Sequence, residues 1–225
     1  GMYNVEGTSD DWFKSDYIIV WVGNPAYTRI PEIHFMHEAR YKGARLVVIA
    51  PDYSATVVHA DTWLNPRVGT DAALGLAMAQ VILSEGLQKV EYIREQTDLP
   101  ILVREDTGRY LREEDLRKGG ATDVLYFWDE AGGRLATVPG CQGEGGRSIA
   151  LGALRPALEG RYEVQLADGS TVAVRPMLVG LRERLDAENT PEQAAGVTGV
   201  SASSIRRIAR ELAAATTAPM LVDGP

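Results

Sequence analysis

The sequence predicts an α/β fold: a Rossmann-like parallel sheet with helices on both faces, plus an inserted excursion and a β-hairpin. Apolar residues run without alternation through 17–22 and again through 45–50, as expected for strands buried on both faces of a parallel sheet. A helical segment separates these two runs, so together they form a βαβ unit. Further along, Asp168-Gly169 lies between two strand-like segments, which is a strong hairpin signal.

Composition limits the classes of function. A chain of 225 residues is long enough for one large domain or for a domain with a subdomain. The net charge of −8 argues against a nucleic-acid backbone as the main partner. The lone cysteine, Cys141, excludes an internal disulfide and a four-cysteine zinc or iron–sulfur site within this chain. No apolar run reaches the roughly 18–20 residues that span a bilayer, so we expect no direct membrane insertion.

The strands and helices follow in order after a polar, acidic stretch over residues 1–16. The expected strands span residues 17–22, 45–50, 62–65, 161–167, 170–175 and 219–222, with the first of them central in the sheet. The expected helices span residues 31–42, 55–60, 72–85 and 90–97, with two more starting at Thr190-Pro191 and at Ser201. Residues 99–103 form a further short apolar segment.

Local signals set the helix boundaries. Pro31 suits the first turn of a helix, and Thr28 is a possible cap for it. Gly43 and Gly86 are placed as C-terminal stops. Thr190 is expected to cap the helix that begins at the following proline.

The middle of the chain differs from what precedes it. Residues 104–160 are charged at first and Gly-rich later, which indicates an inserted subdomain or a long surface excursion with weaker packing than residues 17–85. We therefore expect a nucleotide-binding core over 1–103, an insertion with a hairpin over 104–175, and a helical segment over 176–225 whose final strand returns to the core. Arginines alternate with acidic residues at the start of the insertion, which indicates an ion-pair face or a subunit contact: Arg104, Glu105, Asp106, Arg109, Arg112 and Glu113.

The connection after the first strand is the first candidate site. Gly23 allows close backbone approach and Pro25 removes a donor, so Gly-Asn-Pro ends the strand where open α/β sheets place their ligands. Asn24 could contact a phosphate or an amide there, or bond only to its own turn. The dinucleotide fingerprint G-x-G-x-x-G is absent, so an ordinary NAD-binding domain is not supported.

Two aspartates are the other candidates. Asp52 stands at the tip of the second strand, where an acidic residue can accept hydrogen bonds from ribose hydroxyls or can simply form the turn. Asp71 follows Gly69-Thr70 at a helix start, where it could be an N-cap or could face a purine edge.

The histidines point to no metal site. His34 and His37 lie three residues apart on the first helix and His59 is expected to be remote from them, so helix-surface histidines are favoured over a metal centre. The sequence also shows no P-loop and no Ser/His/Asp arrangement.

Long segments resemble the catalytic subunits of molybdopterin oxidoreductases of the dimethyl sulfoxide reductase family: WVGNPAYTRIPEIHF, EARYKGARLVVIAPDYSATVVHADTWLNPRVGTDAALGLAMAQVI and EQTDLPILVREDTGRYLR. They are most similar to the branch that contains ethylbenzene dehydrogenase, dimethyl sulfide dehydrogenase and the selenate, chlorate and perchlorate reductases. The tail TPEQAAGVTGVSASSIRRIARELA resembles the segment that follows the nucleotide-binding core of that family.

The resemblance implies an internal piece of a larger subunit of anaerobic respiration. Such subunits hold molybdenum with two molybdopterin guanine dinucleotides (Mo-bis-MGD), and this chain is similar to the domain that grips one of them. By resemblance, Asp52 would contact the ribose of this cofactor. Its phosphate and pterin side would be lined by Gly23, Asn24, Pro25 and Thr28. Its guanine would be met by Gly69, Thr70 and Asp71. Many relatives have proline where this chain has Val68.

The resemblance also implies partners. The rest of the catalytic subunit would supply the metal ligand and any iron–sulfur cluster, and an iron–sulfur electron-transfer subunit would accompany it. The complex would lie at the periplasmic or cytoplasmic face of a prokaryotic membrane, and the isolated chain would be inactive. The alternative is a free-standing α/β domain that binds an ordinary nucleotide or serves as an interaction module.

Overall fold

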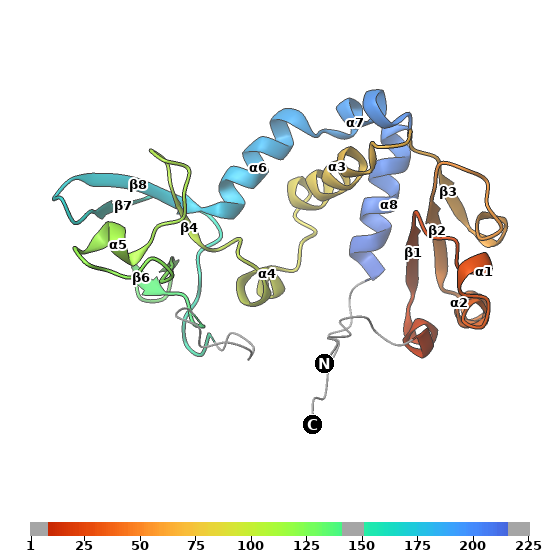
Figure 1. The fold of residues 1–225 in the computed structure, drawn as a ribbon, viewed down its shortest axis with the longest axis horizontal. Coiled ribbons are helices and arrows are strands. Elements are labelled where there is room, and N and C mark those ends of the chain that lie inside the picture. Colours follow the sequence, from red (N-terminus) through yellow and green to blue (C-terminus); the bar gives the residue numbers. More distant parts are fainter. Residues whose placement is uncertain (1–8, 141–150, 216–225) are drawn as a thin grey trace. The chain divides into compact units, whose positions relative to one another are not determined.

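The computed structural model of the chain describes residues 9–140 and 151–215. The chain divides into two compact units, one formed by residues 1–87 with 188–225 and the other by residues 88–187 (Figure 1). We call them the parallel unit and the antiparallel unit, after the pairing of their strands. The expected strand at 219–222 lies outside the described residues, and the expected functional division at 103 and 175 stays a prediction.

The parallel unit has its three described strands in the order β1-β2-β3. Its elements are η1 (Ser9–Lys14), β1 (Tyr17–Trp21), α1 (Pro25–Thr28), α2 (Ile33–Tyr41), β2 (Arg45–Ile49), η2 (Val57–His59), β3 (Thr62–Leu64), α3 (Asp71–Ser84), α7 (Pro191–Thr198) and α8 (Ala202–Ala215). The expected parallel pairing of the first two strands is confirmed, in a register that places Tyr17 opposite Arg45. Among the described strands β2 is in the middle, so the expectation that the first strand is central is wrong for this part of the chain.

Helices cover both faces of this sheet, as expected. Alternate residues of β2 face opposite ways, so Val48 packs with Met36 of α2 while Ile49 packs with Leu74 of α3 and Ile208 of α8. Figure 1 shows α2 on one side of the sheet and α3 with α8 on the other. Since β2 contributes to both clusters, its residues from Leu46 onward are buried.

The expected helix at 31–42 corresponds to α2, and a further short helix that the sequence did not indicate, α1, precedes it. Pro25 occupies the first position of the short α1, where its fixed φ and missing N–H are tolerated. Pro31 lies in the turn that follows, because a proline disfavours helical backbone at the residue before it. Thr28 is therefore the last residue of α1 rather than a cap, and its hydroxyl donates to the Asn24 carbonyl at 3.0 Å. Gly43 ends the helical segment with a φ of +105°, as expected.

The antiparallel unit is built from two small sheets, β4-β8-β7 and β5-β6. Its elements are α4 (Val90–Gln96), β4 (Leu102–Arg104), α5 (Glu113–Leu116), β5 (Tyr126–Asp129), β6 (Arg134–Thr137), β7 (Tyr162–Gln165), β8 (Thr171–Pro176) and α6 (Met177–Glu188). The expected hairpin joins β7 to β8, but its loop has three residues rather than two. The Leu166 N–H donates to the Ser170 carbonyl at 2.8 Å, and Gly169 between them has a φ of +86°, which suits the left-handed position of a three-residue loop.

The antiparallel unit has an apolar cluster of its own, to which residues 104–160 contribute the buried Leu111, and the expected weak packing of residues 104–160 stays a prediction. Leu102, Leu111 and Val174 are fully buried in a separate apolar cluster with Val164 and Val172. The apolar residues of β8 alternate with polar ones, so the antiparallel sheet buries one face while the charged residues stay outside. The antiparallel unit therefore has an apolar core on the covered face of this sheet.

Candidate functional site

The sequence-predicted site residues gather at one edge of the parallel sheet. Because β1, β2 and β3 run in the same direction, their C-terminal ends meet at the same edge, which we call the carboxyl edge (residues 21–28, 50–56 and 65–71). Gly23, Asn24, Pro25 and Thr28 follow β1, Asp52 follows β2, and Gly69, Thr70 and Asp71 follow β3.

The chain changes direction sharply where β1 ends. Val22 still donates its N–H to the Ile49 carbonyl at 2.8 Å, but its own φ is +59°. Left-handed backbone is unfavourable for a β-branched residue and costs on the order of 1–3 kcal/mol, so the surrounding structure must hold it in place. A Cβ on the next residue, Gly23, would lie 3.3 Å from Cγ1 of Val20, which is a tight contact.

Asn24 is held by a residue from a distant part of the chain. Its side-chain oxygen accepts a hydrogen bond from the Thr56 hydroxyl at 2.7 Å, and the same hydroxyl accepts from the Ala26 N–H at 3.2 Å. Thr56 is fully buried. The side chain of Asn24 therefore ties the β1 connection to the β2 connection, and its amide group is not used only within its own turn.

Asp71 is joined directly to the end of β1. It is the first residue of α3, and Thr70 rather than Asp71 stands at the N-cap position. The indole Nε1 of Trp21 donates to Oδ1 of Asp71 at 2.8 Å. The carboxylate is thus oriented by a tryptophan and also lies in the first helical turn, where the helix dipole favours negative charge. The sequence alone did not indicate a role for Trp21. An indole on the last residue of a strand does not reveal a hydrogen-bond partner 50 positions away.

A clamp from α7 holds the loop before Asp71. The guanidinium of Arg67 donates to the carbonyls of Gly196 and Val197 at 2.8 and 3.0 Å, and its backbone N–H donates to the Thr198 carbonyl at 2.8 Å. The Thr70 hydroxyl in turn donates to the Arg67 carbonyl at 2.6 Å. Arg67 is a second supporting residue that the sequence alone did not indicate.

Asp52 stands apart from these contacts. It is exposed after β2, and its carboxylate has no hydrogen bond or ion pair to any described residue. Two residues later, the Ser54 hydroxyl is buried without a partner among the described residues. Asp52 therefore offers an exposed, free acceptor at the carboxyl edge, where a polar ligand could reach it.

The expectation about the histidines is partly wrong. His59 is remote in sequence, yet its ring centroid lies 4.3 Å from that of His37. Burial lowers the pKa of His37, and the nearby His59 and Arg40 lower it further. No group of three or more metal-ligating side chains occurs among the described residues. In the same part of the chain, no helix is both long and apolar enough to cross a membrane.

Comparison with known proteins agrees with the resemblance seen in the sequence. Residues 2–203 match the family model described as "Molybdopterin oxidoreductase". The chain is 44% identical over 233 residues to the perchlorate reductase alpha subunit of Dechloromonas aromatica, covering 95% of this chain and 25% of that protein. It is 42% identical over 205 residues to the chlorate reductase alpha subunit of Ideonella dechloratans, covering 90% and 21%.

The other comparisons extend the same picture. The dimethylsulfide dehydrogenase alpha subunit of Rhodovulum sulfidophilum is 40% identical over 214 residues, covering 95% of this chain and 23% of that protein. Among solved structures, acetylene hydratase from Pelobacter acetylenicus is similar in fold, with a TM-score of 0.50 and 18% identity over 93% of this chain. The chain spans a quarter or less of the length of these three curated relatives.

Proposed function

This chain belongs to the molybdopterin oxidoreductase family, and we propose that it binds one molybdopterin guanine dinucleotide within the catalytic subunit of a molybdenum-dependent oxidoreductase. Family membership implies a molybdenum–pterin cofactor. The observation that carries the proposal of a guanine dinucleotide is the contact between Trp21 and Asp71, which orients a carboxylate at the carboxyl edge of the sheet. A carboxylate can accept both adjacent donors of guanine, N1–H and the N2 amino group, whereas adenine lacks that pair.

The residues at the carboxyl edge fit such a ligand chemically. Asp52 has a free carboxylate that can accept hydrogen bonds from ribose hydroxyls. Gly23 has no side chain where a Cβ would be crowded, and nothing lies within 4 Å of where a Cβ on Gly69 would stand. These features suit close approach of a diphosphate and a flat base, respectively.

The chain's own role in this proposal is to bind and orient. When bound, the cofactor supplies electron transfer at molybdenum. Asn24, Pro25 and Thr28 would line its phosphate and pterin side, while Thr70 would help to shape the loop beside the guanine. The metal ligand, any iron–sulfur cluster and the iron–sulfur electron-transfer partner are proposed to lie outside this chain, consistent with relatives that are named as alpha subunits.

Replacement of Asp71 by asparagine tests the guanine contact in the full-length subunit. Asparagine keeps one acceptor but turns an amino group toward the donors of guanine. Loss of a charged hydrogen-bond partner costs on the order of 1.5–3 kcal/mol, so we expect GDP affinity to fall at least about tenfold. Calorimetric titration of cofactor-free subunit with GDP and ADP measures the change.

The control is Asp123→Asn, which removes an exposed carboxylate from the antiparallel unit. Both variants should keep a melting temperature close to that of the parent, because asparagine keeps an oxygen for the Trp21 indole N–H and the charge lost from the first helical turn is worth only about 0.3–1 kcal/mol. Unchanged GDP affinity in Asp71→Asn would leave Asp71 with a structural role at the start of α3 and would refute the guanine contact.

A further inference from the structure

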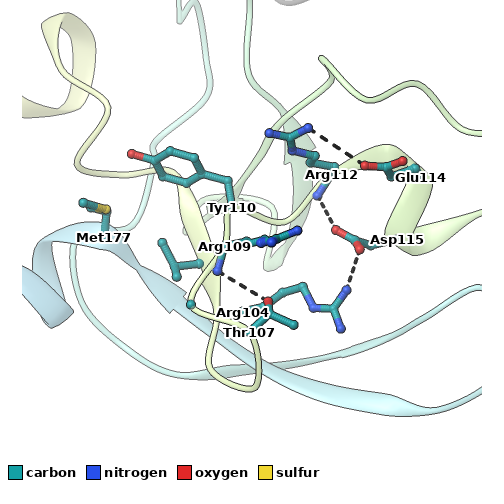
Figure 2. A pocket seen from close by; sticks show the side chains of 10 residues that line it. Arg104, Thr107, Arg109, Tyr110, Arg112, Glu114, Asp115 and Met177 are labelled. Atoms are coloured by element: carbon teal, nitrogen blue, oxygen red, sulfur yellow. Dashed lines mark hydrogen bonds and ion pairs between the residues drawn. The ribbon is translucent and has the colours of Figure 1, made fainter.

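A cavity of about 520 Å³ lies in the antiparallel unit, apart from the residues of the carboxyl edge. It is formed by the strand β4, the turn that follows it and the start of α5 (Figure 2). Three of its lining residues are arginines: Arg104, Arg109 and Arg112. The chain as a whole is acidic, with a net charge of −8. Three arginines around one cavity therefore contrast with the overall charge of the chain.

Two of the three arginines have acidic partners. Arg104 is only 15% exposed at its side chain and is paired with Asp106 at 2.7 Å and with Asp115. The other carboxylate oxygen of Asp115 accepts the backbone N–H of Arg112 at 2.9 Å. Arg112 itself lies 3.9 Å from Glu114, at the limit of an ion pair. The carboxylates that line this cavity are therefore already engaged by arginines 104 and 112.

Arg109 differs from both. Its guanidinium has no hydrogen bond or ion pair to any described residue, although it lines the same cavity. Its backbone is nevertheless held in place, because the Arg109 carbonyl accepts the Arg104 N–H at 2.8 Å and Gly108 makes the preceding turn with a φ of +66°. Leu111, two residues further, is fully buried. A well-supported backbone thus presents an unpaired planar cation to a cavity (Figure 2).

The remaining wall of the cavity is partly apolar. Val103, Tyr110 and Met177 line it, and Met177 is 37% exposed. The Tyr110 hydroxyl donates to Asp98 at 2.9 Å, and burial together with this hydrogen bond raises the pKa of Tyr110 to about 12. The phenol is therefore neutral at physiological pH and adds no negative charge to the cavity.

We propose that this cavity binds a small organic anion, with its carboxylate on Arg109 and its apolar part against Tyr110 and Met177. A guanidinium presents two parallel N–H donors that match a carboxylate, and cavities of roughly 300–1,000 Å³ with a few polar groups are typical of small-molecule sites. An inorganic oxyanion would satisfy the arginine but would leave the apolar wall unused. The proposal is independent of the nucleotide site, since all residues involved lie in the antiparallel unit.

Titration of the chain with benzoate tests this site, with inorganic phosphate and benzyl alcohol as comparison ligands. We expect saturable shifts in the amide NMR signals of residues 103–115 with benzoate, at least about tenfold weaker binding of phosphate, and no binding of the neutral alcohol. Arg109→Gln should weaken benzoate binding at least about tenfold, because it removes the charge and the two-pronged donor. Arg109→Lys keeps the charge alone and should give an intermediate affinity.

Arg134→Gln is the matched control, because it removes an exposed arginine of the same unit that does not line the cavity. It should leave benzoate binding unchanged. The proposal is overturned if benzoate causes no saturable shift, if Arg109→Gln binds benzoate as tightly as the parent, or if phosphate binds as tightly as benzoate. Circular dichroism of each variant verifies that the fold is intact, as expected for exposed positions.

Discussion

The two units of this chain handle polar side chains in opposite ways. In the parallel unit both faces of the sheet are covered by helices, so the polar groups of the candidate site are found at the ends of the strands. In the antiparallel unit one face of each hairpin is free, and charged residues such as Arg161 and Glu105 pair across the surface at 2.6 Å. A sheet that is buried on both faces therefore has its accessible polar side chains at one edge. A half-exposed sheet has them along its turns and its open face.

The largest expected effect comes from the buried middle strand. Ile49 is fully buried at the C-terminal end of β2 and packs against α3 and α8, so Ile49→Ala should lower the free energy of unfolding by about 2–5 kcal/mol. Leu102→Ala, at a fully buried position of the antiparallel unit, should cost a similar amount. Urea denaturation of the two variants measures both costs.

The two variants should nevertheless differ in ligand binding. In the full-length subunit, Ile49→Ala should also weaken GDP binding, because Ile49 adjoins the carboxyl edge, while Leu102→Ala should leave it unchanged. Equal GDP affinities for the two variants would contradict the claim that only the parallel unit supports GDP binding.

A smaller effect is expected from the link between the two strand-end connections. Thr56→Val preserves the side-chain shape but leaves the Asn24 oxygen and the Ala26 N–H without their partner. This should destabilise the parallel unit by about 1–3 kcal/mol. Thr56→Ser keeps the hydroxyl and should restore most of that loss in the same urea denaturation. If valine is as stable as serine, the hydroxyl does not hold the carboxyl edge together.

The smallest expected effect is the dependence of stability on pH near neutrality. It should arise in the parallel unit, because all three histidines, at positions 34, 37 and 59, belong to that unit. The pKa of His37 is lowered below 6.5 in the folded state, so the unfolded chain takes up its proton first as the pH falls. This contribution to stability is complete above pH 6.5 and is progressively lost below it. His37→Gln should therefore flatten the pH dependence of unfolding between about pH 7 and 5. An unchanged dependence in the variant would place its origin elsewhere.

The sequence predicted features that depend on neighbouring residues and missed those that depend on distant ones. Continuous apolar runs indicated β1 and β2, and the strand-end positions of Asn24 and Asp52 followed from those runs. The partners of Asn24 and Asp71 could not be predicted, because Trp21 and Asp71 are 50 positions apart and Thr56 lies 32 positions from Asn24. Such contacts depend on the order and register of the strands, which apolar periodicity does not determine. The same limit explains why the contact between His59 and His37 does not follow from the sequence.

The way the parallel unit is split along the chain has a consequence for protein synthesis. The apolar side of α3 packs against α8, whose residues Ile205 and Ile208 follow the whole antiparallel unit in sequence. At about 5–20 residues per second, a ribosome needs roughly 6–25 s to pass from the end of α3 to the middle of α8. During that interval Leu74, Met78 and Val81 of the nascent chain lack their final covering. The antiparallel unit, with its separate core, can complete its folding first, and the apolar side of α3 stays without its final covering until α8 is made.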